Sequence, residues 1–183
     1  GIYNIYNITA AASLLKNLNF SIKDFSEKNL GFKTAFGRME RIKIKNKELL
    51  LCLIKNPTGF SETLKTLHQS NLISDSCGLI LNDRFADGKD VSWIWDVPLH
   101  AYFNTQSVTV YLAGDRAYDL ALRCKYAGLA SDKIIICENI REMIEKITAT
   151  NSRSITPVCA TYTASLELQN LFQKEGVKKV YWK

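Results

Sequence analysis

The spacing of apolar and polar positions at the start of the chain predicts two helices. Apolar residues recur on one helical stripe over residues 3–18. Ser21 followed by Asp24 is typical of a capped helix start, so we expect a second, short helix through about residue 28.

Residues 39–54, MERIKIKNKELLLCLI, predict a β-hairpin that turns near Asn46 and Lys47. Apolar and charged residues alternate in the first arm, as in an edge strand with one solvated face. The second arm is an apolar run, which is typical of a strand covered on both faces. We therefore expect the first strand at the edge of a sheet and the second in its interior.

After Pro57, short apolar runs alternate with segments of helical periodicity. The predicted strands are 77–81, 108–112, 133–137, 157–160 and 177–181, and the predicted helices are about 60–72, 115–127, 139–149 and 163–174. This alternation predicts an α/β fold: a Rossmann-like, mostly parallel sheet flanked by helices, with an antiparallel hairpin at one side. Ligand sites in such folds gather at the carboxyl ends of the strands.

Composition adds limits to this prediction. With 183 residues, 46% of them hydrophobic, we expect one globular domain over 1–183. The formal net charge is +6, and the sequence holds no apolar run long enough to cross a membrane. The N-terminal residues lack a basic leader and a cleavage pattern, so no signal peptide is expected. The five cysteines contain no C-x-x-C pair, which favours buried thiols in a reducing cytosol.

Several familiar chemical motifs are missing from the sequence. It contains neither a P-loop nor a G-x-G-x-x-G pattern, and Gly114 is typical of a tight turn between a strand and a helix. No serine or cysteine in a nucleophile elbow lies near His68 or His100. The aspartates of 81–97 lack the spacing of a calcium loop, so we expect no metal site in this chain.

Residues 81–97, LNDRFADGKDVSWIWDV, form the most distinctive segment. They begin where a predicted buried strand ends, which places them at the carboxyl edge of the sheet. Dense charge is combined with Trp93 and Trp95, and tryptophan is enriched where partner proteins dock. The alternative is a solvated acidic loop with both indoles folded back into the core.

The hairpin region 38–55 carries six basic residues. A charged face on an edge strand usually protects that edge from aggregation. The more specific alternative is that these residues bind phosphate or an anionic membrane. Binding of nucleic acid is disfavoured because no aromatic residues are interleaved with these charges. A non-catalytic module that binds anionic lipid headgroups or nucleic acid through this hairpin therefore stands as the alternative to an enzyme domain.

Six segments of the chain, in order, resemble the C-terminal domain of the MurT family, the Mur-ligase-like subunit of lipid II isoglutaminyl synthase. They are GIYNIYNITAAA at 1–12, FGRME at 36–40, KNPTGF at 55–60, residues 81–97, GDRAYDLALRCKYAG at 114–128 and TYTASLEL at 161–168. The resemblance covers essentially the whole chain and implies the fold of a Mur ligase C-terminal domain.

The resemblance also implies a reaction. The complete ligase would use ATP and Mg²⁺ to phosphorylate the α-carboxylate of D-glutamate in lipid II, and ammonia would then attack the acyl phosphate. A GatD-like glutaminase subunit would supply the ammonia, in the cytoplasm at the inner face of the cell membrane. The magnesium ligands and a zinc ribbon belong to regions that precede this domain in the family. The domain alone is expected to be inactive.

The resemblance further implies that this domain supplies the acidic residue that completes the Cys-His triad of the glutaminase. That acid matches Asp90. A carboxylate that accepts the imidazole Nδ1–H fixes the tautomer and stabilises the imidazolium. Asp87 and Asp96 are the alternative acids on the same segment. Trp93 and Trp95 would support the loop or bury against the glutaminase.

The remaining residues implied by the resemblance concern the nucleotide. Asn4 and Asn7 match an N-x-x-N pattern whose amides would bind the adenine edge, or would simply cap a helix. Arg38 matches an arginine presented to the terminal phosphate, for which a guanidinium is well suited. Lys55 and Asn56 fall where such ligases contact ribose or phosphate, although the wider Mur pattern usually has an aspartate there.

Overall fold

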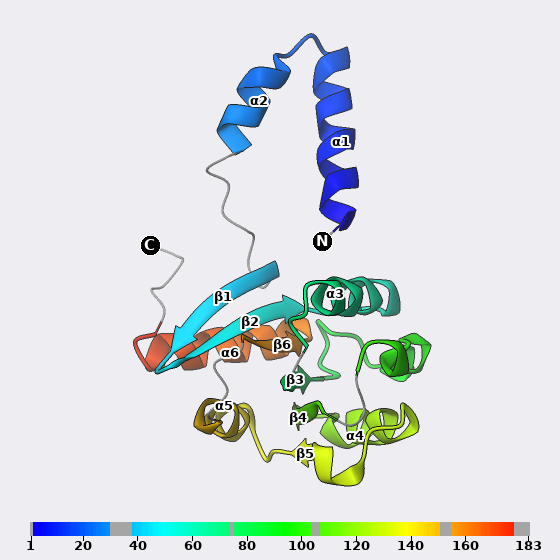
Figure 1. Cartoon of the computed structure of the whole chain (residues 1–183), viewed down its shortest axis with the longest axis vertical. Coiled ribbons are helices and arrows are strands. Elements are labelled where there is room, and N and C mark those ends of the chain that lie inside the picture. The colour runs from blue at the N-terminus through cyan, green and yellow to red at the C-terminus, as the bar shows by residue number, and fades with distance from the viewer. Residues whose placement is uncertain (1, 30–37, 74, 104–106, 151–154, 178–183) are drawn as a thin grey trace. The chain divides into compact units, whose positions relative to one another are not determined.

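The computed structural model of the chain describes residues 2–29, 38–73, 75–103, 107–150 and 155–177. The chain divides into two compact units, Gly1–Phe36 and Gly37–Lys183, and each is described by itself (Figure 1). The assignment of residues 1–183 to a single domain stays a prediction.

The first unit consists of two helices, α1 (Ile2–Asn17) and α2 (Ile22–Asn29). The Ser21 hydroxyl oxygen accepts a hydrogen bond from the Asp24 backbone N–H (3.2 Å), as the capping pattern predicted. Large apolar side chains of this unit are exposed, namely Ile5, Tyr6, Ile8, Leu14, Leu18 and Phe20.

The second unit is built on a six-stranded sheet in the order β1-β2-β6-β3-β4-β5. The strands are β1 (Arg38–Ile44), β2 (Lys47–Leu53), β3 (Ser76–Ile80), β4 (Thr109–Ala113), β5 (Ile134–Ile136) and β6 (Thr156–Ala160). β1 and β2 pair antiparallel, and every other neighbouring pair is parallel. The mostly parallel α/β sheet, its edge hairpin and the interior position of β2 are therefore confirmed, whereas most of the predicted strand 177–181 lies outside the described residues.

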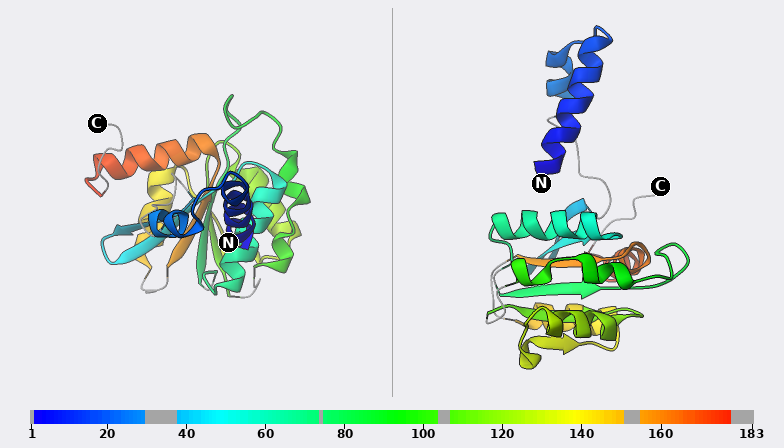
Figure 2. Two further views of the ribbon diagram at one scale, coloured as in Figure 1. Left: turned by 90° about the horizontal axis from the view of Figure 1, so that it is seen from above. Right: turned by 90° about the vertical axis from the view of Figure 1, so that its right-hand side faces the viewer.

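Four helices cover the two faces of the sheet (Figures 1 and 2). Their bounds are α3 (Pro57–Gln69), α4 (Ala117–Tyr126), α5 (Ile140–Ala149) and α6 (Tyr162–Lys174). The helices α3 and α4 lie on one face, and α5 and α6 lie on the other. Three short 3₁₀ turns, Ser92–Asp96, Leu99–Ala101 and Ser131–Lys133, were not predicted from the sequence.

Two apolar clusters, one on each face of the sheet, form the core. The first joins Phe60 and Leu64 of α3 to the sheet, and the second joins Leu168 and Phe172 of α6 to its opposite side. All five cysteines are buried, as predicted. Burial disfavours a thiolate and raises the pKa of Cys124 to about 12.

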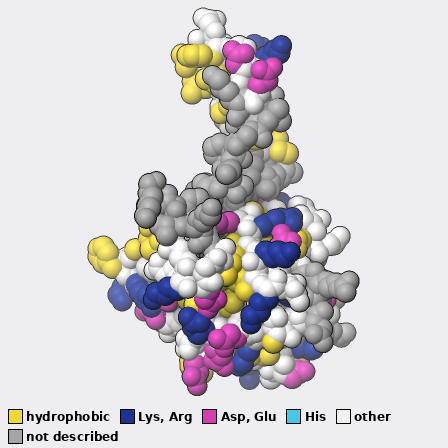
Figure 3. All heavy atoms as spheres, turned by 90° about the vertical axis from the view of Figure 1, so that its left-hand side faces the viewer, with side chains coloured by type: hydrophobic (Ala, Val, Ile, Leu, Met, Phe, Trp, Pro, Cys, Tyr) yellow, Lys and Arg dark blue, Asp and Glu magenta, His cyan; other side chains and the backbone are white. Residues whose placement is uncertain are grey.

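Charged side chains of both signs share the surface over α5 and α6 (Figure 3). Arg141 of α5 pairs with Glu175 at 2.6 Å, and Lys146 pairs with Glu142 at 2.8 Å. Within the described ranges, no helix has the length and apolar character needed to cross a membrane.

The sheet topology brings the predicted site segments of this unit to one edge. β2, β6, β3 and β4 all end there because they run parallel. β1 runs the other way, and Arg38 at its start is paired with Cys52 near the end of β2, so it reaches the same edge. The register of β1 shifts between Arg38 and Glu40, where Met39 has φ +58°. Such bulges redirect side chains and are frequent beside functional sites.

Candidate functional site

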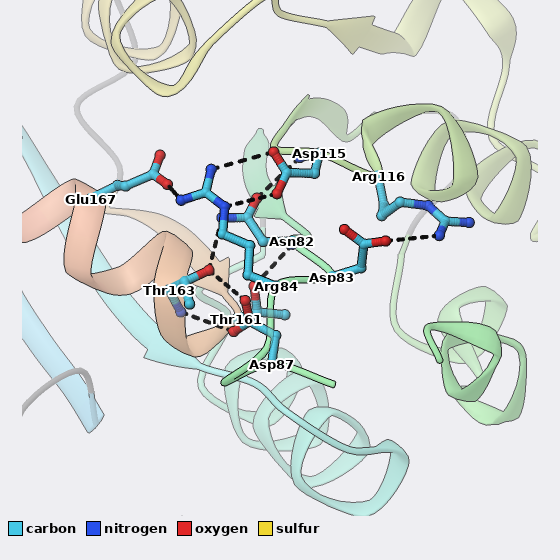
Figure 4. Close-up of polar contacts among 9 residues, drawn as sticks. All are labelled: Asn82, Asp83, Arg84, Asp87, Asp115, Arg116, Thr161, Thr163 and Glu167. Atoms are coloured by element: carbon cyan, nitrogen blue, oxygen red, sulfur yellow. Dashed lines mark hydrogen bonds and ion pairs between the residues drawn. The ribbon is translucent and has the colours of Figure 1, made fainter. Parts of the chain in front are cut away.

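Asn82, the second residue after β3, connects the ends of three strands (Figure 4). Its side chain is 1% exposed. Its backbone N–H donates to the Thr161 hydroxyl oxygen (3.0 Å), its amide nitrogen donates to the Thr163 hydroxyl oxygen (3.0 Å), and its amide oxygen accepts from the Asp115 backbone N–H (3.0 Å). Because Thr161 directly follows β6 and Asp115 follows β4, the backbone and side chain of Asn82 together fix the start of the 81–97 segment to both neighbouring strands.

Asp87 anchors the middle of the same segment to α6. Its carboxylate accepts from the Thr163 backbone N–H (2.9 Å) and from the Thr163 hydroxyl. Thr163 lies in the first turn of α6, where unpaired N–H groups and the helix dipole favour a negative charge. Both carboxylate oxygens of Asp87 are therefore committed inside this chain.

Two arginines connect the segment to neighbouring elements (Figure 4). Arg84 donates to both oxygens of Asp115, at 2.9 and 3.3 Å, and also pairs with Glu167 of α6. Asp83 accepts from Arg116, just before α4, at 3.3 Å. Partly exposed ion pairs of this kind are weak one at a time, so their combined effect on the position of the loop matters more than any single pair.

Gly114 forms the tight turn between β4 and α4 that its sequence position suggests. Its φ is +97°, and a Cβ added there would lie 2.6 Å from the Leu81 carbonyl oxygen. This close approach lets the Arg116 N–H donate to the same carbonyl at 2.9 Å. The absence of a side chain at Gly114 thus allows the end of β4 to lie close to the end of β3.

Asp90 is exposed on this anchored segment. Its Oδ1 accepts from the Ser92 backbone N–H at 2.8 Å, and hydrogen bonds from the Ser92 side chain and backbone hold the pKa of the Asp90 carboxyl below its usual value. A cavity of about 240 Å³ opens beside it, lined by Lys89, Asp90, Val91, Ser92, Ile94, Trp95, Arg116 and Asp119. The site therefore presents an ionised, oriented and accessible carboxylate.

Replacing Ser92 by alanine is expected to raise the Asp90 carboxyl pKa toward its ordinary value, because the side-chain hydrogen bond to the carboxylate is lost. The backbone N–H remains, so the pKa should stay below that of a free aspartate. An NMR titration of the Asp90 carboxyl carbon between pH 2 and 6 measures the change. An identical titration curve in both proteins would contradict the assignment.

The two tryptophans of the segment point in different directions. Trp93 is partly buried and packs edge-on against Phe60 of α3, with ring centroids 6.4 Å apart. Trp95 is 46% exposed and meets Tyr126 edge-on at 5.6 Å. The expectation that both indoles fold back onto the core therefore holds for Trp93 only, and Trp95 stays on the surface next to the exposed Asp96. Docking of a partner at this segment stays a prediction.

The predicted nucleotide residues of the second unit lie where β2 ends. Lys55 is exposed, and Asn56 caps α3, since its amide oxygen accepts from the Gly59 N–H at 2.7 Å. The amide nitrogen of Asn56 keeps its capacity to donate. Arg38 begins β1, and its side chain lies outside the described residues.

The predicted adenine residues, Asn4 and Asn7, both lie on α1 of the first unit. The Asn7 side chain is exposed, and the side chain of Asn4 lies outside the described residues. Their assignment to a nucleotide stays a prediction.

The basic hairpin uses part of its charge within the fold. Arg41 pairs with Glu48 across the two strands at 3.0 Å. Lys47 is 3% exposed and donates to the Thr150 hydroxyl oxygen at 2.9 Å. Lys43 and Lys45 are exposed, so the outward charge is smaller than the sequence suggests.

Sequence reasoning missed the residues that hold the 81–97 segment in place. Asn82, Thr161, Thr163 and Arg123 received no role, although Asn82 and Thr161 lie within two residues of a strand end. Polar residues immediately after buried strands were the available signal. In the part of the chain that the structure describes, no three His, Cys, Asp or Glu side chains are grouped to hold a metal ion.

Comparisons with known proteins agree with this architecture. The folylpolyglutamate synthase of Thermotoga maritima superposes with a TM-score of 0.60 at 17% identity, over 97% of this chain and 40% of that one. The MurF ligase of Thermotoga maritima, solved in complex with ADP, gives 0.58 at 18% identity, over 93% and 38%. These likenesses show the fold.

Sequence relatives identify the family. The lipid II isoglutaminyl synthase (glutamine-hydrolyzing) subunit MurT of Streptococcus pneumoniae is 32% identical over 180 residues, 97% of this chain and 39% of that protein. The MurT subunit of Staphylococcus aureus (strain COL) is 34% identical over 128 residues, 69% of this chain and 29% of that protein. The chain thus spans about two fifths or less of these relatives. The family described as MurT ligase C-terminal matches residues 53–165, more than half of the sequence, and the chain belongs to that family.

Proposed function

We propose that this chain is the C-terminal part of a ligase subunit that amidates the α-carboxylate of D-glutamate in lipid II. The ammonia would come from glutamine hydrolysed by a GatD-like glutaminase subunit, in the cytoplasm at the inner face of the membrane. The names of the MurT relatives, which are glutamine-hydrolysing synthase subunits, support this proposal. The proposal makes the chain part of peptidoglycan biosynthesis.

The observation that carries the proposal is the state of Asp90. Of the three candidate acids, Asp87 has both oxygens committed to Thr163, whereas Asp90 is exposed and held by Ser92 at one oxygen. An ionised carboxylate in this state is suited to accept the Nδ1–H of a histidine that arrives on another subunit. The partner's cysteine would then lose its proton to that histidine as it attacks glutamine.

The exposed residues near Asp90 suit a subunit interface. Trp95 and Asp96 would contact the glutaminase, because both remain on the surface of this chain. Trp93 and Asp87 would instead support the segment from behind, through Phe60 and Thr163.

ATP would be contacted at the same sheet edge by residues of the second unit. Lys55 is an exposed cation, the Asn56 amide nitrogen is available as a donor, and Arg38 begins the neighbouring strand. When bound, ATP activates a carboxylate as its acyl phosphate, and these residues would hold its phosphates and ribose. Mg²⁺ would be held by ligands outside this chain, because the described residues contain no group of acidic side chains placed to hold a metal ion.

The proposal is tested with the full-length subunit and a candidate glutaminase, produced separately and together. We expect glutamine hydrolysis to be low for the glutaminase alone and to rise by orders of magnitude in the complex, because the triad is complete only there. Mass spectrometry of lipid II should show amidation that requires ATP. A glutaminase equally active without the subunit would contradict the proposal.

A further inference from the structure

Arg123 of α4 is a buried cation bound to the segment that carries Asp90. It is 6% exposed. Its guanidinium donates to the backbone carbonyl oxygens of Ile94 (3.2 Å) and Val97, and its carbon lies 5.5 Å from the ring centroid of Trp95. Among the described residues, no carboxylate pairs with it.

Burial of this charge is unfavourable by itself. Desolvation lowers the pKa of the Arg123 guanidinium from its usual value, and an apolar side chain of similar length would fill the space at less cost. What the guanidinium adds is a planar set of donors for two carbonyl groups. The hydrogen bonds of Arg123 therefore stabilise the backbone of the turn.

The carbonyls that Arg123 binds belong to the 3₁₀ turn Ser92–Asp96 and its C-terminal cap, Val97. This turn has no side-chain hydrogen bond at its N-cap, Val91. Its first residue, Ser92, donates the N–H that orients the Asp90 carboxylate. Arg123, the turn and Asp90 thus form one continuous series of contacts.

We propose that Arg123 is a positioning residue that fixes the direction of the Asp90 carboxylate by holding the carbonyls of the Ser92–Asp96 turn. This proposal rests on the proposed function of Asp90. Because Arg123 is buried in this chain, its effect on the reaction would pass through the turn.

The first test replaces Arg123 by methionine in the full-length subunit assembled with its glutaminase. The kcat for glutamine hydrolysis should fall roughly ten- to a hundredfold, the scale expected when a catalytic group is displaced by about 1 Å. The KM for glutamine should stay unchanged, because glutamine binds to the partner. Arg123→Lys keeps the charge but reaches one carbonyl at a time, so its kcat should lie between those of the wild type and Arg123→Met.

Two controls separate positioning from a general loss of structure. Arg141→Met removes an exposed arginine that pairs with Glu175 over α5, and it should leave kcat unchanged. In the Asp90→Asn background, Arg123→Met should have no further effect on kcat, because the residue through which it acts is already disabled. If Arg123→Met lowers kcat by the same factor in the Asp90→Asn background as in the wild type, the proposal is overturned.

A second readout needs no partner. The pKa of the Asp90 carboxyl, followed by NMR, should rise toward its ordinary value in Arg123→Met, because the Ser92 N–H no longer holds it in place. If Arg123→Met fails to fold, Arg123→Lys provides both measurements. Unchanged kcat and an unchanged Asp90 titration overturn the positioning role. Full hydrolysis by Asp90→Asn alone would refute the proposed function instead, and the titration then decides the role of Arg123.

Discussion

Asp90→Asn is expected to lower glutamine hydrolysis by the assembled complex about 10³- to 10⁴-fold while leaving the subunit folded. The asparagine amide carries no negative charge to stabilise the imidazolium. It also favours the wrong histidine tautomer. Asp90 is exposed and its side chain packs against nothing in the core, so stability should change little. Ammonia released from glutamine provides the measurement, and size-exclusion chromatography monitors assembly.

Asp132→Asn is the matched control, since Asp132 is an exposed aspartate of the Ser131–Lys133 turn, outside the 81–97 segment. It should retain hydrolysis close to that of the wild type, and Asp96→Asn tests the alternative acid on the segment. Amidation of lipid II with added ammonium salt should survive in Asp90→Asn, because this reaction bypasses the glutaminase. Full glutamine hydrolysis by Asp90→Asn would remove the triad assignment, and loss of hydrolysis confined to Asp96→Asn would transfer that role to Asp96.

Gly114→Ala is expected to lower the free energy of unfolding by about 3 kcal/mol or more. The new Cβ would lie 2.6 Å from the Leu81 carbonyl oxygen and 2.7 Å from the Asn82 amide oxygen, at a φ of +97° that non-glycine residues rarely adopt. The Leu81 carbonyl belongs to the backbone and cannot rotate away, so β3 and β4 must separate. Urea unfolding of the 183-residue chain, followed by circular dichroism, measures the loss.

Gly88→Ala separates the two causes of that loss. Gly88 has a similar φ of +91°, but a Cβ there would meet nothing within 4 Å. Only the conformational penalty remains, about 1–2 kcal/mol. Equal losses in the two variants would show that the contact with Leu81 has no part in the effect.

Much of the fold could be predicted because its signals are local. The apolar run of β2 indicates that both faces of the strand are buried. The alternation of apolar and charged residues in β1 indicates that one face is solvated. The hairpin, the parallel strands and the carboxyl-edge position of 81–97 follow from such patterns. The 3₁₀ turn Ser92–Asp96 has no equivalent signal, because a single turn is too short to show periodicity.

The candidate site was less accessible to sequence reasoning. Trp93 and Trp95 are identical residues two positions apart, and the turn between them decides that one packs on Phe60 and the other faces solvent. Arg123 binds carbonyl groups, which every residue possesses, so its partners leave no trace in the sequence. Asp90 could be selected from its neighbours only through the family resemblance, and its accessibility required coordinates.

The burial of all five cysteines has a practical consequence for studying this protein. Enclosed thiols react slowly with maleimides and iodoacetamide, which need an accessible thiolate. A cysteine introduced at an exposed position such as Lys89 would therefore be the preferred target for a fluorophore or a cross-linker. Site-specific labelling beside Asp90 becomes possible without first deleting the native thiols.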